Sequence, residues 1–295
     1  MRKIRRFLGK NRFIIALLIA FCLLDFTLGA AQPVERLTLF WKNDYEKIVL
    51  QNGTSRFDRA FYGNSAVTAS YIEGDGGYAN LGIDYGTVLD LLAMLKGGYV
   101  EIGSELVVGL NYLCFLDSLD TDPTYPWHRR ALEPYLYFQR DRLYPFFADG
   151  LARVLRGGEF VERAGLWRFV YYGRLDDEAM AKKVGTHREQ FWGIALDGYA
   201  ENLAALPELI EFCRGAGIDL RAVWMPFNGA LEMPETARDV QRRADEVFTL
   251  YGVEALDMTD SVPSGYFHDI GHLEYETGAP YFTELIAPWL AGGGT

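Results

Sequence analysis

The stretch at residues 105–115, ELVVGLNYLCF, is the part of the sequence that decides the fold. It is a continuous apolar run of strand length, which is typical of a strand buried on both faces. Such strands belong to parallel sheets, because the crossover helices cover both faces. Just upstream, TVLDLLAML at 87–95 has the spacing of an amphipathic helix, and Gly97-Gly98 closes it. The two segments together predict an α/β domain.

Two shorter apolar runs precede this helix, and each ends in turn residues. AFY at 60–62 leads into GNS at 63–65, and YANL at 78–81 leads into Gly82. After residue 187 the alternation returns, with helices expected at 188–216, 234–251 and 277–290 and strands at 220–225 and 253–258. Strand–turn–helix alternation of this kind predicts a three-layer α/β/α domain with a parallel sheet. The segments at 36–41 and 47–50 fit a strand or a short helix equally well.

The middle of the chain, from about residue 116 to residue 187, breaks this alternation. It is rich in aromatic residues and arginine, as in YPWHRRALEPYLYFQRDRLYPFF. We interpret it as a largely helical insertion that supplies mostly core and lid. Because Trp, Tyr and Arg are also enriched at contact surfaces, the alternative is a surface that faces the membrane, a glycan or a partner protein.

The N-terminal segment has the composition of a membrane anchor. Six basic residues lie within the first twelve, and an apolar run, FIIALLIAFCLLDFTLGA, occupies 13–30. Eighteen helical residues are just enough to cross a hydrocarbon core of about 30 Å. The positive-inside rule then puts 1–12 in the cytoplasm and the body outside. A cleaved signal peptide is the alternative, but the run exceeds the usual signal core of about 7–15 residues, so we favour a single-pass anchor.

Length and composition limit what the rest of the chain can be. The 295 residues suffice for one large domain besides the anchor, and 49% apolar with 23% charged residues favours a packed core. The net charge of −11 argues against nucleic-acid binding, which rests on Lys and Arg. We therefore expect a cytoplasmic segment at 1–12, a transmembrane anchor at 13–30, a linker at 31–59, and a sheet domain at 60–292 with an insertion at about 116–187.

The three cysteines carry little information. Cys22 lies in the anchor, and Cys114 and Cys213 lie in apolar surroundings. Their spacing is not that of a metal site, and we expect neither a metal nor a cofactor. A Cys114–Cys213 disulfide is compatible with an oxidising compartment but is not required.

Four polar segments follow one another in an order that suits acyl-transfer chemistry. GNS at 63–65 follows the first predicted strand, Gly82 follows the second, Asn111 lies in or just beyond the third, and DIGH at 269–272 precedes the last helix. Acyl transfer needs a nucleophilic hydroxyl, a base, a carboxylate that orients the base, and donors for the oxyanion. In a parallel sheet these groups belong at the carboxyl ends of strands. Each segment alone also fits a turn, a helix cap or a surface histidine, but their combination favours a site.

The four segments resemble the motifs of SGNH (GDSL-type) hydrolases. That family carries a G-[DNS]-S nucleophile, an oxyanion glycine, a G-x-N-[D] motif and a C-terminal D-x-x-H. Here the corresponding segments are GNS at 63–65, NLG at 80–82, GLN at 109–111 and DIGH at 269–272. The chain is similar to the subgroup that contains the D-alanyl transfer protein of teichoic-acid modification and the exopolysaccharide O-acetyltransferases. Members share a basic N-terminal anchor, a large insertion and a tail like FHDIGHL at 267–273.

The resemblance implies a role for each of five residues. Ser65 would be the nucleophile, His272 the base, and Asp269 the carboxylate that orients the base. Gly82 and Asn111 would complete an oxyanion hole with the Ser65 amide.

Some residues depart from the family pattern or compete with it. Tyr112 stands where many hydrolases have Asp after the Asn, which weakens the role of that Asn more than it weakens the triad. His268 is an alternative base, although the D-x-x-H spacing favours His272. We expect His128 and His187, which lie in or beside the insertion, to be structural or surface residues.

The resemblance implies an extracytoplasmic membrane enzyme with an SGNH-like three-layer fold. We expect it to transfer or remove an acyl group on a cell-envelope or secreted polysaccharide, or on a teichoic-acid-like polymer, through an acyl-enzyme on Ser65. A membrane-embedded O-acyltransferase is the expected partner. The alternatives are a free-standing esterase or lipase with the same triad, and a non-catalytic scaffold of a polysaccharide-modification complex.

The basic cluster before the apolar run predicts the membrane topology. A reporter that works only outside the cytoplasm is expected to be active when fused after Thr295 and inactive when fused after Arg12. The full-length chain is expected in the membrane fraction. Release of a shortened, soluble body would instead show a cleaved signal peptide.

Overall fold

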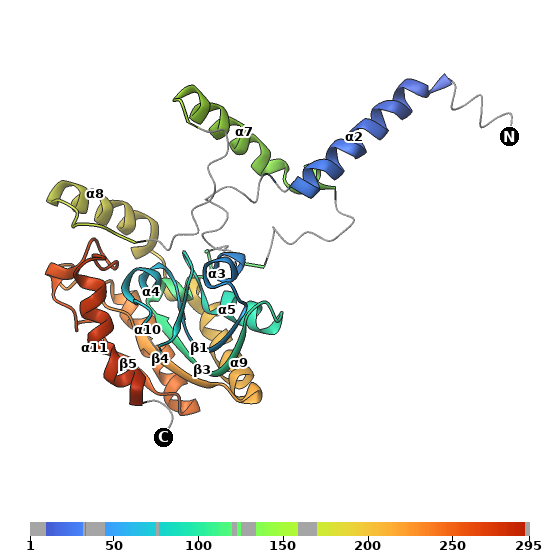
Figure 1. Cartoon of the computed structure of the whole chain (residues 1–295). Coiled ribbons are helices and arrows are strands. Elements are labelled where there is room, and N and C mark those ends of the chain that lie inside the picture. The colour runs from blue at the N-terminus through green and yellow to red at the C-terminus, as the bar shows by residue number, and fades with distance from the viewer. Residues whose placement is uncertain are drawn as a thin grey trace. The chain divides into compact units, whose positions relative to one another are not determined.

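The computed structural model of the protein describes residues 10–31, 33, 45–74, 77–119, 123–124, 134–158 and 170–292. The chain forms two compact units, Met1–Trp41 with Tyr125–Gly165 and Lys42–Thr124 with Leu166–Thr295 (Figure 1). The segment at about 116–187, which we interpreted as one insertion, is shared between the two units.

The second unit is built on a five-stranded parallel sheet in the order β2-β1-β3-β4-β5, which confirms the predicted α/β class. Its strands are β1 (Arg56–Gly63), β2 (Ala79–Gly82), β3 (Glu101–Leu110), β4 (Asp219–Trp224) and β5 (Ala255–Asp257). The parallel pairing puts all five carboxyl ends at one edge. Because β1 has β2 on one side and β3 on the other, the order reverses there, and such switch points are where open α/β sheets bind ligands.

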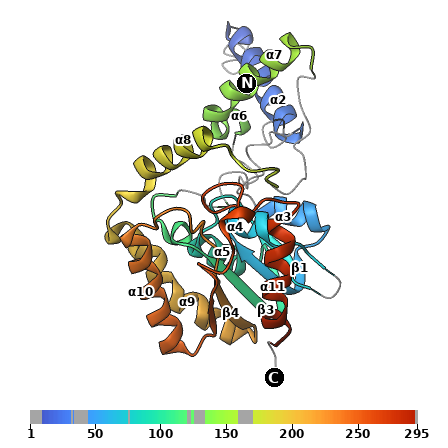
Figure 2. The same cartoon turned by 90° about the vertical axis from the view of Figure 1, so that its left-hand side faces the viewer.

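Helices cover both faces of this sheet (Figure 2). One face carries α5 (Val88–Lys96), α9 (Ala200–Ala216) and α10 (Glu235–Tyr251), and the other carries α4 (Ser65–Ser70) and α11 (Gly278–Gly292). Alternate residues of β3 serve the two cores, since Leu106 and Val108 pack with the first set of helices and Val107 with the second. The continuous apolar run therefore contributes side chains to two hydrophobic cores, as expected for a buried parallel strand.

The third strand ends earlier than its apolar pattern predicts. The strand predicted at 105–115 stops at Leu110, and the 3₁₀-helix η2 (Tyr112–Phe115) follows. Asn111 caps η2, because its side-chain Oδ1 accepts a hydrogen bond from the Leu113 amide at 3.0 Å. A side chain that bonds to the local backbone competes with the strand ladder, so the prediction was wrong beyond Leu110.

The helix predicted at 188–216 is also shorter, since α9 begins only at Ala200. The preceding residues form a π-helix, η3 (Arg188–Trp192), and a 3₁₀-helix, η4 (Leu196–Tyr199). The Asp117 carboxylate accepts hydrogen bonds from the amides of Glu201 and Asn202, at 2.9 and 3.0 Å, and so caps α9. Because this cap is distant in the sequence, the local pattern does not reveal where α9 begins.

Other elements lie close to their expected places. Residues 47–50, which fitted a strand or a short helix equally well, belong to a helix, α3 (Tyr45–Asn52). Helix α3 and the start of β1 both lie in the segment at 31–59 that we expected to be a linker. The alternative segment at 36–41 falls outside the described residues. Cys114 and Cys213 are both buried and free. The remaining elements of the second unit are α8 (Asp177–His187) and η5 (Ser264–Tyr266).

In its described residues, the first unit consists of three helices, α2 (Arg12–Ala31), α6 (Tyr135–Phe138) and α7 (Arg140–Leu155). Helix α2 has a mean hydropathy of 2.5 and is long and apolar enough to cross a membrane, a property that signal sequences share. Asp25, the charged residue in this apolar run, accepts hydrogen bonds from the amides of Tyr135 and Leu136 at 3.0 and 2.7 Å. The charge therefore caps the start of α6.

A buried arginine, Arg221, forms hydrogen bonds to several elements of the second unit. In β4, Arg221 donates from Nε to Glu105 Oε1 at 2.6 Å and from Nη2 to the Tyr78 hydroxyl at 2.7 Å. It also donates to the carbonyls of Trp289 and Leu290, at 2.7 and 3.1 Å, in the last turn of α11. Arg221 and Glu105 are both buried. A buried guanidinium needs such partners, and helix carbonyl ends attract positive charge.

This ion pair yields a stability prediction. Glu105→Gln is expected to lower the free energy of unfolding by about 3–5 kcal/mol, because it leaves an uncompensated buried charge. The matched control is Glu101→Gln. Glu101 lies on the same strand, β3, and pairs with Arg56 of β1 at 2.8 Å, but both side chains are exposed, so the loss should be at most about 1 kcal/mol. Urea unfolding of the full chain in mild detergent measures both, and equal losses would contradict the prediction.

Candidate active site

Close packing between α4 and the sheet sets the position of Ser65. Gly63 and Gly109 lie side by side at the carboxyl ends of β1 and β3. A Cβ atom would lie 2.4 Å from Val67 Cγ2 if built on Gly63, and 2.3 Å from the same atom if built on Gly109. Only glycine leaves this room, so α4 rests directly on strand backbone. Ser65, the first residue of α4, is thereby held at the switch point of the sheet.

Asn64 joins the first and third strand ends. Its Oδ1 accepts a hydrogen bond from the Ala66 amide at 2.9 Å and so caps α4. Its Nδ2 donates to Asn111 Oδ1 at 2.8 Å. Asn64 is buried, whereas Ser65 and Asn111 are partly exposed. One side chain therefore orients both the helix that carries Ser65 and the side chain of Asn111.

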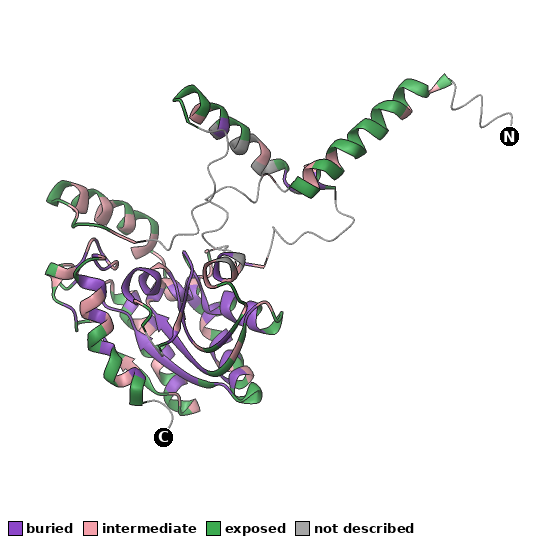
Figure 3. Ribbon diagram, viewed as in Figure 1, coloured by how far each residue is buried: buried purple, intermediate pink, exposed green. Residues whose placement is uncertain are grey.

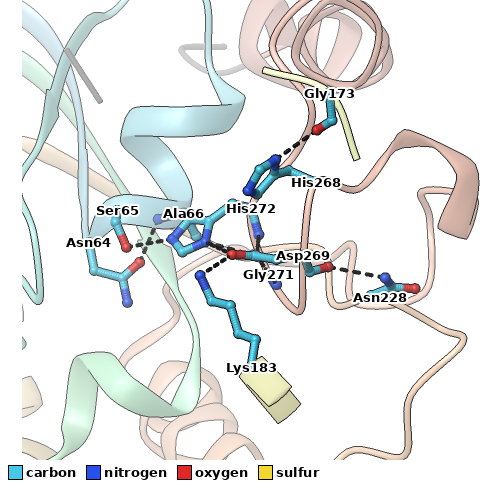
Figure 4. Close-up of polar contacts among 10 residues, drawn as sticks. All are labelled: Asn64, Ser65, Ala66, Gly173, Lys183, Asn228, His268, Asp269, Gly271 and His272. Carbon is cyan, nitrogen blue, oxygen red and sulfur yellow. Dashed lines mark hydrogen bonds and ion pairs between the residues drawn. The ribbon is translucent and has the colours of Figure 1, made fainter. Parts of the chain in front are cut away.

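The structure brings the three predicted triad residues together (Figure 4). Ser65 Oγ lies 2.9 Å from His272 Nε2, and His272 Nδ1 lies 2.9 Å from both carboxylate oxygens of Asp269. Asp269 is fully buried, while His272 is partly exposed. A hydroxyl, an imidazole and a carboxylate in this order can activate the hydroxyl as a nucleophile.

The loop that carries Asp269 and His272 is held by its own backbone and by Asn228. Asp269 Oδ1 accepts hydrogen bonds from the amides of Gly271 and His272, at 3.1 and 2.9 Å. Asn228 follows β4, and its Nδ2 donates to the Asp269 carbonyl at 3.0 Å while its own amide donates to Ile270. The sequence analysis missed Asn228, although a polar residue just after a strand was a usable signal.

Lys183 of α8 is a further charged residue at the site, with its Nζ 2.5 Å from Asp269 Oδ2. Burial alone raises the pKa of the Asp269 carboxyl, but hydrogen bonds from His272 and Lys183, together with the positive charge of Lys183, outweigh it and hold that pKa well below its ordinary value. Asp269 is therefore ionised at neutral pH. It accepts a hydrogen bond from His272 Nδ1–H, which leaves Nε2 free to accept a hydrogen bond from Ser65.

Tyr171 completes the surroundings of the imidazole. Its ring stacks on His272, with the ring centroids 4.1 Å apart and the planes 17° from parallel, and Lys183 Nζ lies 6.0 Å from its centroid. Burial raises the pKa of the Tyr171 hydroxyl, which therefore stays neutral. Tyr171 and Lys183 were not predicted, because they lie far from the D-x-x-H motif in sequence and only the tertiary structure brings them to it.

The other histidines take different positions. His268 Nδ1 lies 2.7 Å from the Gly173 carbonyl, and its ring is turned away from Ser65 (Figure 4). His187 lines the candidate cavity and lies 2.6 Å from the Tyr112 hydroxyl. Burial lowers the pKa of His187 to about 4, so it is neutral at pH 7. His128 lies outside the described residues.

A cavity of about 240 Å³ opens beside the triad. Polar residues that line it include Asp84, Asn111 and Lys183. Its apolar lining includes Leu110, Leu113, Trp224, Met225, Phe227 and Met233. An apolar cavity with a few convergent polar groups is typical of a site for a small organic group.

Of the two predicted oxyanion residues, Asn111 lines this cavity and Gly82 does not. The Gly82 amide donates to Asn80 Oδ1 at 3.0 Å, and a Cβ on Gly82 would lie 2.6 Å from the Thr68 amide nitrogen. Gly82 is thus a packing glycine under α4 whose N–H is already engaged. The turn after β2 reaches the cavity through Tyr85 instead, which has a φ of 55°, rare for a bulky residue.

Comparisons with known protein families and with curated proteins found no match to this sequence. The function is therefore inferred from the geometry of the site and from its motifs.

The depressed pKa of Asp269 yields a pH-dependent prediction. Its contribution to stability is fully present above the unfolded-state pKa of about 3.9 and is lost as the pH falls further. Asp269→Asn is expected to lower the free energy of unfolding by about 1.5–3 kcal/mol at neutral pH, with a gap to wild type that shrinks below about pH 4. Urea unfolding of both proteins between neutral and acid pH measures this gap.

Asp245→Asn is the control for this prediction. Burial raises the pKa of the Asp245 carboxyl, so its replacement should not reproduce the same loss at neutral pH. A gap between wild type and Asp269→Asn that stays constant from neutral to acid pH would show that Asp269 gains nothing from its charged partners.

Proposed function

We propose that this protein is a membrane-anchored serine O-acyltransferase or esterase of the SGNH type that acts outside the cytoplasm. The observation that carries the proposal is the 2.9 Å contact between Ser65 Oγ and His272 Nε2, backed by the buried, ionised Asp269. A serine hydroxyl is a weak nucleophile until a base of this kind takes its proton. The site also lies where open α/β sheets bind ligands.

The geometry supports a two-step acyl transfer. Ser65 Oγ attacks the carbonyl carbon of an acyl donor while His272 Nε2 takes the hydroxyl proton, and the leaving group departs with that proton. A sugar hydroxyl or water then attacks the acyl carbon while His272 Nε2 takes its proton. The bond between Ser65 Oγ and the acyl carbon breaks, and His272 returns the proton to Oγ. The Ser65 amide and Asn111 Nδ2 are the proposed oxyanion donors. Loss of one such donor typically slows the reaction about a hundred- to thousandfold.

Two arguments support the SGNH assignment and the location. The order of the site residues along the chain, from Ser65 after β1 to Asp269 and His272 before α11, follows the family motifs. The basic residues before the apolar helix α2 favour an extracytoplasmic body. The expected role of Gly82 in the oxyanion hole gains no support, because its amide donates to Asn80 Oδ1. A cell-envelope or secreted polysaccharide as acceptor rests on the resemblance.

A membrane-embedded acyltransferase is the proposed partner. Activated acyl donors such as thioesters are made in the cytoplasm, so a membrane protein must carry the acyl group across before Ser65 can receive it. A tethered domain gains effective concentration at the exit of such a carrier, which a diffusing enzyme would not.

The nucleophile assignment is tested by covalent labelling. An organophosphonate is expected to label Ser65, and Ser65→Ala and His272→Ala should each abolish labelling, because one removes the nucleophile and the other its base. Ser70→Ala is the matched control, since Ser70 is buried at the far end of the same helix and should not affect labelling. Mass spectrometry locates the adduct, and an adduct elsewhere in the folded protein would refute the assignment.

An experiment in cells that make the polysaccharide distinguishes the acyltransferase, the free-standing esterase and the scaffold. Ser65→Ala is expected to abolish acylation of the polymer, and the wild-type protein should co-purify with a membrane acyltransferase in mild detergent. Acylation that persists with Ser65→Ala would favour the scaffold. Full acylation by a secreted form without α2, with no co-purifying membrane protein, would favour the free-standing esterase.

A further inference from the structure

Helix α7 carries an exposed apolar stripe formed by Leu151, Val154 and Leu155. These side chains are 57%, 47% and 78% exposed, and Figure 3 shows exposed positions toward the C-terminal end of α7. Their spacing of three and four residues puts them on one face of the helix. Soluble surfaces rarely leave such a set uncovered, so the stripe marks a contact with something apolar.

The same compact unit contains α2, and this association indicates what covers the stripe. None of the residues of α2 is buried, and its mean hydropathy is 2.5. Asp25 holds the start of α6 against α2 six residues before α2 ends at Ala31, which is about 9 Å along the helix axis. When α2 crosses a membrane, α6 and the start of α7 therefore lie near the boundary of the hydrocarbon.

Near this boundary, backbone N–H groups have an acceptor within the protein, and the neighbouring side chains are of the types found at membrane surfaces. Lipid cannot satisfy backbone N–H groups, and the Asp25 carboxylate accepts from both Tyr135 and Leu136. At the start of α7, the Arg140 guanidinium lies 4.7 Å from the centroid of the Tyr137 ring, which is 70% exposed. Tyrosine and arginine are typical of the membrane–water interface.

We propose that α7 lies in the membrane interface on the side where α2 ends, with the stripe turned into the acyl chains. The first unit then contacts the bilayer twice, through α2 across it and through α7 along its surface. A helix with one apolar face and basic residues beside it binds membranes in this way. The inference goes beyond the proposed enzyme and rests only on insertion of α2.

The test places an environment-sensitive fluorophore at single cysteines in the full chain, reconstituted in vesicles of phosphatidylcholine and phosphatidylglycerol. The exposed Cys22 is replaced by alanine. Cys114 and Cys213 are kept, because they are buried and burial raises the pKa of both thiols to about 12. Labels are introduced with Leu151→Cys and Leu155→Cys on the stripe. Leu250→Cys on α10 is the matched control, since Leu250 is 80% exposed and Leu155 is 78% exposed.

The fluorescence emission of the labels at 151 and 155 is expected to shift to shorter wavelength. It should be quenched by nitroxide lipids and shielded from aqueous iodide, whereas the label at 250 should remain accessible to iodide. Labels at 151 and 155 that behave like the one at 250 would overturn the inference and leave the stripe for a protein partner, because the vesicles contain lipid alone. A label at Leu23→Cys in α2 reports membrane insertion independently. Lipid quenching at 23 without quenching on the stripe would refute the interfacial position of α7 but not the anchor.

Discussion

The packing of α4 against bare strand backbone at Gly63 and Gly109 is the constraint on which the candidate site depends. A side chain at either position would collide with Val67 and lift α4 from the sheet. Ser65 begins that helix and lies 2.9 Å from His272, so even a small displacement would break the contact. Productive geometry at a reacting centre tolerates very little movement, which is consistent with a proposed nucleophile that is placed by a sheet edge rather than by a free loop.

The rest of the site is assembled from distant parts of the chain by burial and charge. Asp269 is fully buried, and it stays ionised because His272 and Lys183 donate hydrogen bonds to it and Lys183 supplies a positive charge. Asn228 fixes the backbone of the same loop from the end of β4, and Tyr171 covers the imidazole. The segment at 170–187 is thus part of the candidate site, since it provides both a cation and an aromatic face to the triad.

The two units divide the proposed work. The second unit carries the candidate site, and its stability depends on buried groups such as Arg221, whose partners join β3, β4 and α11. The first unit carries the apolar surface. The hydrogen bonds that Asp25 accepts from the amides of Tyr135 and Leu136 explain why a charge is tolerated near the end of an otherwise apolar helix. Under the proposed function, the anchor would hold the candidate site at the membrane surface, where the proposed partner would deliver the acyl group.

Much of the fold and the triad could be predicted from the sequence. Apolar runs of strand length, amphipathic helices and turn residues are local patterns, and they were sufficient for a parallel α/β sheet. The grouping of Ser65, Asp269 and His272 at its edge was predicted from the order of the polar motifs and their resemblance to those of SGNH hydrolases. Only the tertiary structure decided that β3 stops at Leu110, that Gly82 packs under α4 instead of facing the cavity, and that Lys183 and Tyr171 join the site. The physical reason is that periodicity records which residues are buried, whereas hydrogen bonds and ion pairs between distant residues depend on distances that exist only after the chain has folded.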